Sequence, residues 1–299
     1  MQCCLATYAI ILSVLVGNGA DGISFASYFG NHMVLQRAPQ RATVWGYGST
    51  VGNTVTVVLS GEGAYNTTVT SAAYLKKGGI WKVMLPAVGI GGPYDITVTE
   101  NSVGAGNSGG TDKARIADVW FGDVWICSGQ SNMQFTLDMG FNASTELEES
   151  SNYPLIRVFT VKETQSTTPQ FDLLAVEEPW SIPNKDTVGH KPWTYFSAVC
   201  WLYGKYLFQT LGYPIGLVDT TWGGTPIEDW SSPDALAQCQ TPRPQQRFED
   251  PGLPKSVDLT NSSLWNAMIH PCSPSNMTIL WGVWYQGMST SVQTCTGSF

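Results

Sequence analysis

The segment CSGQSNMQF, from Cys127 to Phe135, places a serine in a tight polar turn directly after an apolar, β-rich run, DVWI. Ser131 is therefore expected where a strand turns into a helix, and the backbone N–H groups at such a point have no intrahelical partner. These groups favour developing negative charge. A serine there can attack a carbonyl carbon while its own N–H helps to hold the oxyanion. The alternative interpretation is that Ser131 caps the next helix.

Two later turns carry residues that suit the same chemistry. In TWGGTPIEDW, a turn at Gly223 and Gly224 lets the backbone approach a substrate and present an N–H, although an ordinary tight turn has the same pattern. Gln286 follows the apolar run LWGVWY, and its amide is a candidate third oxyanion donor or simply a polar strand-end residue. Trp222 and Trp230 could form a flat wall for a sugar ring, and the alternative is that they are core.

The elements expected to position these turns alternate between strand and helix from Ile116 onward. This order predicts an α/β domain with a parallel sheet and helices on its faces, in which ligands gather at the carboxyl ends of the strands. The three turns follow three such strand ends. The helix AVCWLYGKYLFQTLG is expected to end at Gly212, with Val199, Leu202 and Tyr206 on one face. The other expected elements are strands at 117–128, 155–161, 213–219 and 278–285 and a short helix at 264–269.

Residues 23–113 have a different pattern, with short β-branched or alternating runs separated by Gly, Pro or Asn. This pattern predicts a small all-β, sandwich-like domain that ends in the Gly/Ser-rich segment Asn101–Asp112. The segments Pro169–Pro192 and Pro242–Pro254 are rich in proline and are expected to be surface loops.

Composition excludes several classes of function. Hydrophobic residues make up 43% of the chain and charged residues 13%, which is enough for a sizeable core. With a net charge of -8, the chain lacks the basic surface that binding of nucleic acid or anionic lipid would require. This excess of acidic residues is compatible with a neutral ligand and provides no general electrostatic attraction for an anionic ligand.

The first 20 residues resemble a secretory signal peptide, because an apolar run from Leu5 to Val16 precedes small residues. A buried N-terminal helix is the alternative. No later run is long enough to span a membrane, so no membrane partner is expected after cleavage. Five cysteines would remain; Cys127 and Cys200 are interpreted as buried thiols, with no pairing assigned. Glycosylation sequons, which favour surface positions and a lysosomal or secreted destination, begin at Asn66, Asn142, Asn261 and Asn276.

Four segments together resemble the sialate O-acetylesterase family, a carbohydrate-esterase branch of the SGNH hydrolases. They are FGDVWICSGQSNMQF, YPIGLVDTTWGGTPIEDW, LWNAMIHP and GVWYQG. The opening SFASYFGNHMVLQRAPQRATVWGYG is similar to that family's N-terminal β domain. The resemblance implies a serine hydrolase, lysosomal or secreted, that removes O-acetyl groups, notably from the 9-position of sialic acid. It implies no metal and no organic cofactor.

The resemblance also implies roles for individual residues. Ser131 matches the nucleophile, Gly224 with Gly223 beside it matches the second oxyanion turn, and Gln286 lies in the block that carries the third donor. Trp222, Trp230 and Glu228 are the expected substrate-binding residues. A glycosidase would need a second carboxylate opposite Glu228, and none is identified.

The sequence departs from the family pattern after Gly287. Relatives continue as QGES and later contain the catalytic pair Asp-x-x-His, whereas Met288 and a Ser/Thr-rich tail (288–299) follow here. We therefore expect a partial esterase domain (116–287), a truncated isoform or an incomplete gene model, and an uncovered apolar edge. None of the three histidines, His32, His190 and His270, lies in an Asp-x-x-His pattern. His190 is the best placed of them to act as the base.

Two hypotheses of function follow. The first is an esterase that works through an acetyl-enzyme on Ser131, with a low rate if its base is absent. The second is a non-catalytic fragment that binds acetylated sugar or acts as a regulatory isoform.

Overall fold

The computed structural model describes residues 22–49, 51–61, 68–74, 79–101, 112–189, 191–238, 261–273 and 276–286. Several expectations concern residues outside these ranges and stay predictions. They are the signal segment (1–20), the sequon at Asn66, most of the Gly/Ser-rich segment (102–111), His190, the loop Pro242–Pro254 and the tail 288–299.

The N-terminal region forms two sheets, which confirms the small all-β region predicted from its short runs. A three-stranded sheet has the order β1 (Ser24–Phe25), β3 (Thr43–Tyr47) and β6 (Ile80–Met84). The other contains antiparallel β5 (Thr68–Tyr74), β4 (Thr54–Gly61) and β7 (Gly91–Asn101). Alternate residues of β4, which are Val55, Val57 and Leu59, are buried, as a strand with one face on a core requires.

Strand β8 (Asp112–Gly129) joins this region to the α/β part. Its first half pairs antiparallel with β7, and its second half pairs parallel with β11 (Ile215–Thr221) on one side and β12 (Trp281–Tyr285) on the other. The domain boundary expected at 113–116 therefore falls inside a continuous strand. The division into two domains stays a prediction.

The α/β sheet has the order β10–β9–β11–β8, with β12 on the far side of β8. Strands β9 (Ile156–Val161), β11, β8 and β12 run parallel, as predicted. Strand β10 (Val176–Ser181) pairs antiparallel with β9, so the sheet is mixed at this edge. The expectation of a loop over Pro169–Pro192 was wrong for these residues, because Trp180 packs on Phe159 and buries the strand. Short β2 (Val34–Gln36) also pairs parallel with β8.

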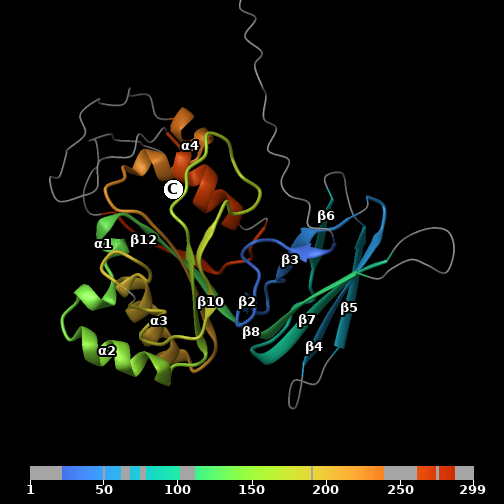
Figure 1. Cartoon of the computed structure of the whole chain (residues 1–299), viewed down its shortest axis with the longest axis horizontal. Coiled ribbons are helices and arrows are strands. Elements are labelled where there is room, and N and C mark those ends of the chain that lie inside the picture. The colour runs from blue at the N-terminus through green and yellow to red at the C-terminus, as the bar shows by residue number, and fades with distance from the viewer. Residues whose placement is uncertain are drawn as a thin grey trace, which may run out of the picture.

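Helices flank this sheet (Figure 1). Helix α3 (Ala198–Leu211) begins at its cap Ser197 and ends at Gly212, which adopts φ 70° as expected for a helix C-terminus. Its buried face contains Cys200, Trp201 and Gly204. The predicted apolar face is not the buried one, and Tyr206 is exposed. The remaining helices are α1 (Ser131–Gln134), η2 (Leu137–Met139), α2 (Ala143–Glu149), η3 (Ser150–Asn152), η4 (Ile227–Trp230), α4 (Pro233–Ala237), η5 (Trp265–Ile269) and η6 (His270–Cys272).

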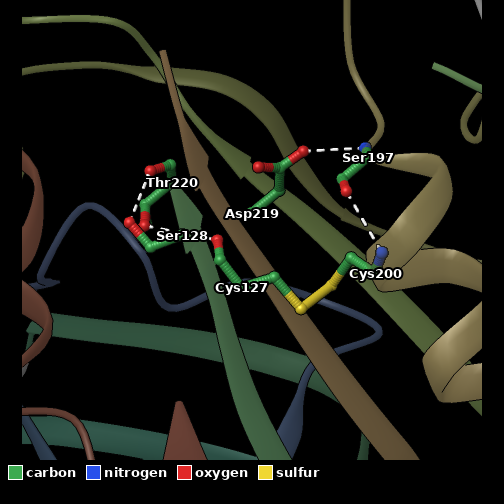
Figure 2. The surroundings of a disulfide bond; sticks show 6 residues. All are labelled: Cys127, Ser128, Ser197, Cys200, Asp219 and Thr220. Atoms are coloured by element: carbon green, nitrogen blue, oxygen red, sulfur yellow. Dashed lines mark hydrogen bonds between the residues drawn. A yellow bond between two sulfur atoms is a disulfide. The ribbon is translucent and has the colours of Figure 1, made fainter. Parts of the chain in front are cut away.

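A disulfide explains which face of α3 is buried. Cys127 in β8 and Cys200 in α3 form a disulfide bond across the helix–sheet interface, so their interpretation as separate buried thiols was wrong (Figure 2). Close packing next to it also requires a small residue, because a Cβ atom on Gly204 would lie 2.4 Å from Leu217 Cδ1. Cys272 is buried and has no disulfide. In the described part of the chain, no helix combines the length and apolar character needed to cross a membrane.

Candidate functional site

Ser131 lies at the carboxyl end of β8, as the first residue of α1. The cap position belongs to Gln130, whose side chain makes no capping bond, so Ser131 is not the helix cap of the alternative interpretation. The Ser131 side chain is partly buried, and its hydroxyl donates a hydrogen bond to Gln130 Oε1 at 2.5 Å. Among the described residues its N–H has no hydrogen-bond acceptor and is available to a ligand.

Gly129 is where the three predicted turns meet. Its carbonyl oxygen accepts a hydrogen bond from the Trp222 N–H at 3.1 Å. A Cβ atom at this position would lie 2.2 Å from the carbonyl oxygen of Tyr285, and its φ of 144° is one that L side chains rarely adopt. The glycine of SGQSN therefore allows the end of β12 to approach the serine turn.

The double-glycine turn lies directly against Ser131. A Cβ atom on Gly223 would be 3.4 Å from both Ser131 Cα and Cβ. The Gly223 N–H donates to Gln134 Oε1 at 2.7 Å and is therefore occupied. Gly224 has φ 73°, and its N–H has no hydrogen-bond acceptor within the described ranges. Gly224 rather than Gly223 can therefore donate to an oxyanion.

Gln286 connects the third turn to the other two. Its Nε2 donates to the carbonyl oxygen of Thr225 at 3.0 Å. Its own carbonyl oxygen accepts a hydrogen bond from Gln130 Nε2, and the Gln130 N–H donates to Tyr285 O at 3.3 Å. The parallel register of β8, β11 and β12 thus brings together three turns that are far apart in the sequence, as the strand pattern predicts.

The residues expected to bind substrate are less exposed to solvent than side chains that stack on a sugar ring need to be. Trp230 is only 4% exposed, and its Nε1 donates to Thr225 Oγ1 at 2.7 Å, which matches the core interpretation. Trp222 packs partly against the main core, and Glu228 is buried in η4. Trp230 also lines an apolar cavity of about 700 Å³ together with Trp284, whose ring it contacts edge-on. Sugar contacts by Trp222 and Glu228 stay predictions.

The described histidines make their hydrogen bonds away from Ser131. His32 Nδ1 lies 2.7 Å from Asp118 Oδ2, and His270 Nδ1 lies 2.8 Å from the carbonyl oxygen of Gln170. His190 is outside the described residues. The described part of the chain thus brings Ser131, Gly224 and Gln286 together, while their roles as nucleophile and oxyanion donors, and the identity of the base, stay predictions.

A polar cavity of about 290 Å³ lies beside the serine turn, at the carboxyl ends of β9 and β11. Neither Glu163 nor Gln134 was singled out from the sequence, although Lys162 and Glu163 directly follow the predicted strand at 155–161. Burial raises the pKa of Asp219 to about 6. The hydrogen bond that its carboxylate accepts from the Ser197 N–H lowers the pKa, but this effect is smaller than that of burial (Figure 2). Glu163 Oε1 accepts a hydrogen bond from Gln134 Nε2 at 2.6 Å, which connects this cavity to α1.

The sequons differ in exposure. Asn142 and Asn261 are exposed, as expected for glycan acceptors. Asn276 is only 1% exposed, and its Nδ2 donates to the carbonyl oxygen of Phe171 at 3.2 Å, so the expected surface position was wrong for this residue. No group of three or more His, Cys, Asp or Glu residues in the described ranges is arranged to hold a metal ion.

This chain is similar in sequence to several proteins named as esterases. The family model described as "Carbohydrate esterase, sialic acid-specific acetylesterase" matches residues 121–297. Sialate O-acetylesterase of Rattus norvegicus is 43% identical over 93% of this chain and 54% of its own length. The Homo sapiens protein of that name is 42% identical over 92% of this chain and 51% of its own length. This chain therefore spans about half the length of these relatives.

A solved structure shows the same fold. The crystal structure of a carbohydrate acetylesterase from Xanthomonas citri superposes with a TM-score of 0.70 at 28% sequence identity. The match covers 89% of this chain and 51% of that one.

Proposed function

This chain belongs to the family of sialic acid-specific carbohydrate acetylesterases, and on that premise we propose that its Ser131 turn is the nucleophile and oxyanion site of an O-acetyl ester hydrolase. The observation that carries the proposal is the meeting of three turns at one serine. The N–H groups of Ser131 and Gly224 make no other hydrogen bond among the described residues, and the Gln286 amide lies in the turn beside them.

In the proposed reaction, Ser131 Oγ attacks the acetyl carbonyl carbon, and the carbonyl oxygen becomes an oxyanion. Hydrogen bonds from the Ser131 and Gly224 N–H groups stabilise that charge. The Gln286 amide, whose Nε2 donates to Thr225 O, would have to turn toward the oxyanion to add a third. The sugar hydroxyl leaves with a proton and an acetyl-enzyme remains, which water hydrolyses to acetate and free serine. The proton of Ser131 needs a base, and Gln130 Oε1, which now accepts its hydrogen bond, is not one.

We place this base outside the described residues. Loss of a triad member leaves a residual rate that the oxyanion hole and substrate binding supply. Without that base, slow acetylation of Ser131 is the activity expected.

Trapping the acetyl-enzyme tests the proposal. The purified chain is incubated with 4-nitrophenyl acetate, and release of nitrophenol is measured together with the intact mass and the acetylated peptide. We expect a single added acetyl group on the peptide that contains Ser131, and none in Ser131→Ala. Ser151→Ala is the matched control, because its exposed hydroxyl bonds only the local Glu148 carbonyl. Equal hydrolysis by the Ser131→Ala variant and the unmodified chain would contradict the proposal and favour a non-catalytic fragment.

We propose an O-acetylated sugar, including 9-O-acetylated sialic acid, as the substrate. We further propose a secretory-pathway location, lysosomal or extracellular. The disulfide between Cys127 and Cys200 supports this location, since such bonds persist in oxidising compartments and are rare in the cytosol. Expression in animal cells followed by endoglycosidase treatment tests it; a mass shift at Asn142 or Asn261 is expected.

A further inference from the structure

We propose that the polar cavity beside Ser131 binds an uncharged, hydroxyl-rich part of a sugar and excludes a carboxylate. We call it the acceptor cavity and define it by Thr160, Glu163, Glu177, Trp193, Asp219 and Thr221. The choice of an acetylated sugar as its ligand rests on the proposed function, but the chemistry of the cavity does not.

The acceptor cavity shares a wall with the serine turn. Gln134 of α1 lines it, and the same side chain donates to Glu163 Oε1 at 2.6 Å and accepts from the Gly223 N–H at 2.7 Å. Thr221, at the end of β11, directly precedes the Trp222–Gly224 turn. A ligand in the cavity therefore lies next to the bond that Ser131 would attack.

Two buried oxygen atoms in the cavity wall point to a ligand with hydroxyl groups. Asp219 is 2% exposed and Thr160 is 8% exposed. Thr160 Oγ1 makes no hydrogen bond to a described residue. Asp219 Oδ1 makes none of normal geometry, although the hydroxyl and N–H of Thr221 lie close enough to the carboxylate to lower its pKa. Buried polar atoms are nearly always paired, so a ligand that donates O–H groups would satisfy both.

The charges in the cavity determine which part of a sugar enters. Its titratable groups are Lys162 and Glu163 at the end of β9, Glu177 on β10, Asp219 on β11, and Tyr195 in the segment before α3. Glu178 on β10 also interacts electrostatically with Asp219. The Lys162 ammonium is paired with Glu177 at 2.7 Å. A carboxylate that entered would face the remaining acidic groups, and no unpaired cation among the described residues lines the cavity. Sugar hydroxyls would not be repelled.

An aromatic side chain completes the site. Trp193 lines the cavity and is 43% exposed, with its ring edge-on to Phe135 at 6.3 Å between centroids. An exposed aromatic face beside a few convergent polar groups is typical of sites for small polar ligands.

The test measures binding without turnover, by calorimetry on the Ser131→Ala chain. The two probes are the methyl glycoside of 9-O-acetylated sialic acid, which is an anion, and its carboxyl methyl ester, which is neutral. At pH 7.5 we expect the neutral ester to bind about tenfold tighter or more. This difference should narrow at pH 5, because burial raises the pKa of both Asp219 and Glu163 to about 6, and both carboxylates bind a proton below that pH.

Three further variants in the same background locate the site. Trp193→Ala should weaken binding of both probes about tenfold, and Asp219→Asn should remove most of the difference between them. Trp281→Ala is the matched control, because Trp281 is an exposed tryptophan outside the cavity, and it should leave both affinities unchanged.

Equal affinity for the two probes at pH 7.5, no binding of either, or no effect of Trp193→Ala would each overturn the proposal. These results are independent of catalysis. Binding as expected without any acetylation of Ser131 in the unmodified chain would contradict only the proposed hydrolase. Acetylation of Ser131 without binding in the acceptor cavity would contradict only the cavity.

Discussion

Gly129 determines whether the serine turn and the end of β12 can meet. Alanine at this position would bring its Cβ to 2.2 Å from Tyr285 O and would need an unfavourable φ of 144°. We expect Gly129→Ala to lower the free energy of unfolding by about 1–3 kcal/mol and to slow acetylation of Ser131 about 100-fold, because a small displacement of the reacting groups has a large effect on rate. Thermal unfolding and the rate of acetyl-enzyme formation check this.

The matched control is Gly30→Ala, since a Cβ atom there would have no neighbour within 4 Å. It should leave both quantities close to those of the unmodified chain. If Gly129→Ala behaved like Gly30→Ala, the close approach of β12 to the serine turn would be wrong.

Local sequence patterns predict the positions of residues that follow strand ends. They predict less well the positions of residues whose contact partner is far away in the sequence. Ser131, Gly224 and Gln286 each follow an apolar run, so their meeting could be predicted from the strand order alone. The pairing of Cys127 with Cys200 could not, because both lie in apolar segments and only the packing of α3 on β8 brings them together. Asn276 is buried for a similar reason, since its partner Phe171 is 105 residues away.

At the scale of elements, the disulfide fixes α3 against β8. It closes a loop of 73 residues between Cys127 and Cys200, and such a crosslink stabilises mainly by restricting the unfolded chain. We expect reduction to lower the free energy of unfolding by about 2–5 kcal/mol. Denaturant unfolding with and without reductant measures the change.

The double variant Cys127→Ala/Cys200→Ala provides the control, because its stability should be lower and should not respond to reductant. A loss of stability on reduction that persisted in this variant would have to come from cleavage of another disulfide. The predicted contribution of the Cys127–Cys200 bond would then be wrong.

The same helix shows which features of an element its sequence can define. The ends of α3 follow local chemistry: Ser197 accepts a hydrogen bond from the Cys200 N–H, and Gly212 adopts a left-handed conformation. Its buried face does not follow the apolar pattern, because the disulfide and the close contact of Gly204 with Leu217 select the other face. Strand β10 was not predicted, because it contains few apolar residues and lies within a proline-rich segment.

At the scale of the whole molecule, β8 pairs with β7 of the N-terminal region and with β11 and β12 of the α/β part, so the stability of these two parts should be coupled. Buried carboxyl groups near the edge strands give this stability a dependence on pH. Burial raises the pKa of Glu178 in β10 to about 8, and the nearby Asp219 also raises it. Asp219 itself has a pKa raised to about 6 by burial.

A carboxyl group whose pKa is higher in the folded chain than in the unfolded chain binds its proton more tightly when folded. The contribution of Glu178 to stability is therefore fully present below its unfolded pKa, near 4.5, and is lost as the pH rises toward about 8. We expect the melting temperature of the unmodified chain to fall between pH 5 and pH 8. Glu178→Gln should reduce this fall and should melt about 5 °C higher than the unmodified chain at pH 8.

Melting curves at pH 5, 6.5 and 8 measure the effect, and Glu148→Gln is the control because it removes an exposed carboxylate from α2. This control should shift all three melting temperatures little. If Glu178→Gln and Glu148→Gln gave parallel curves, Glu178 would be ionised at no cost in the folded chain, and its burial between β10 and the rest of the sheet would be wrong. A flatter curve for Glu178→Gln alone would assign the fall in stability to a single buried carboxyl group at the edge next to the acceptor cavity.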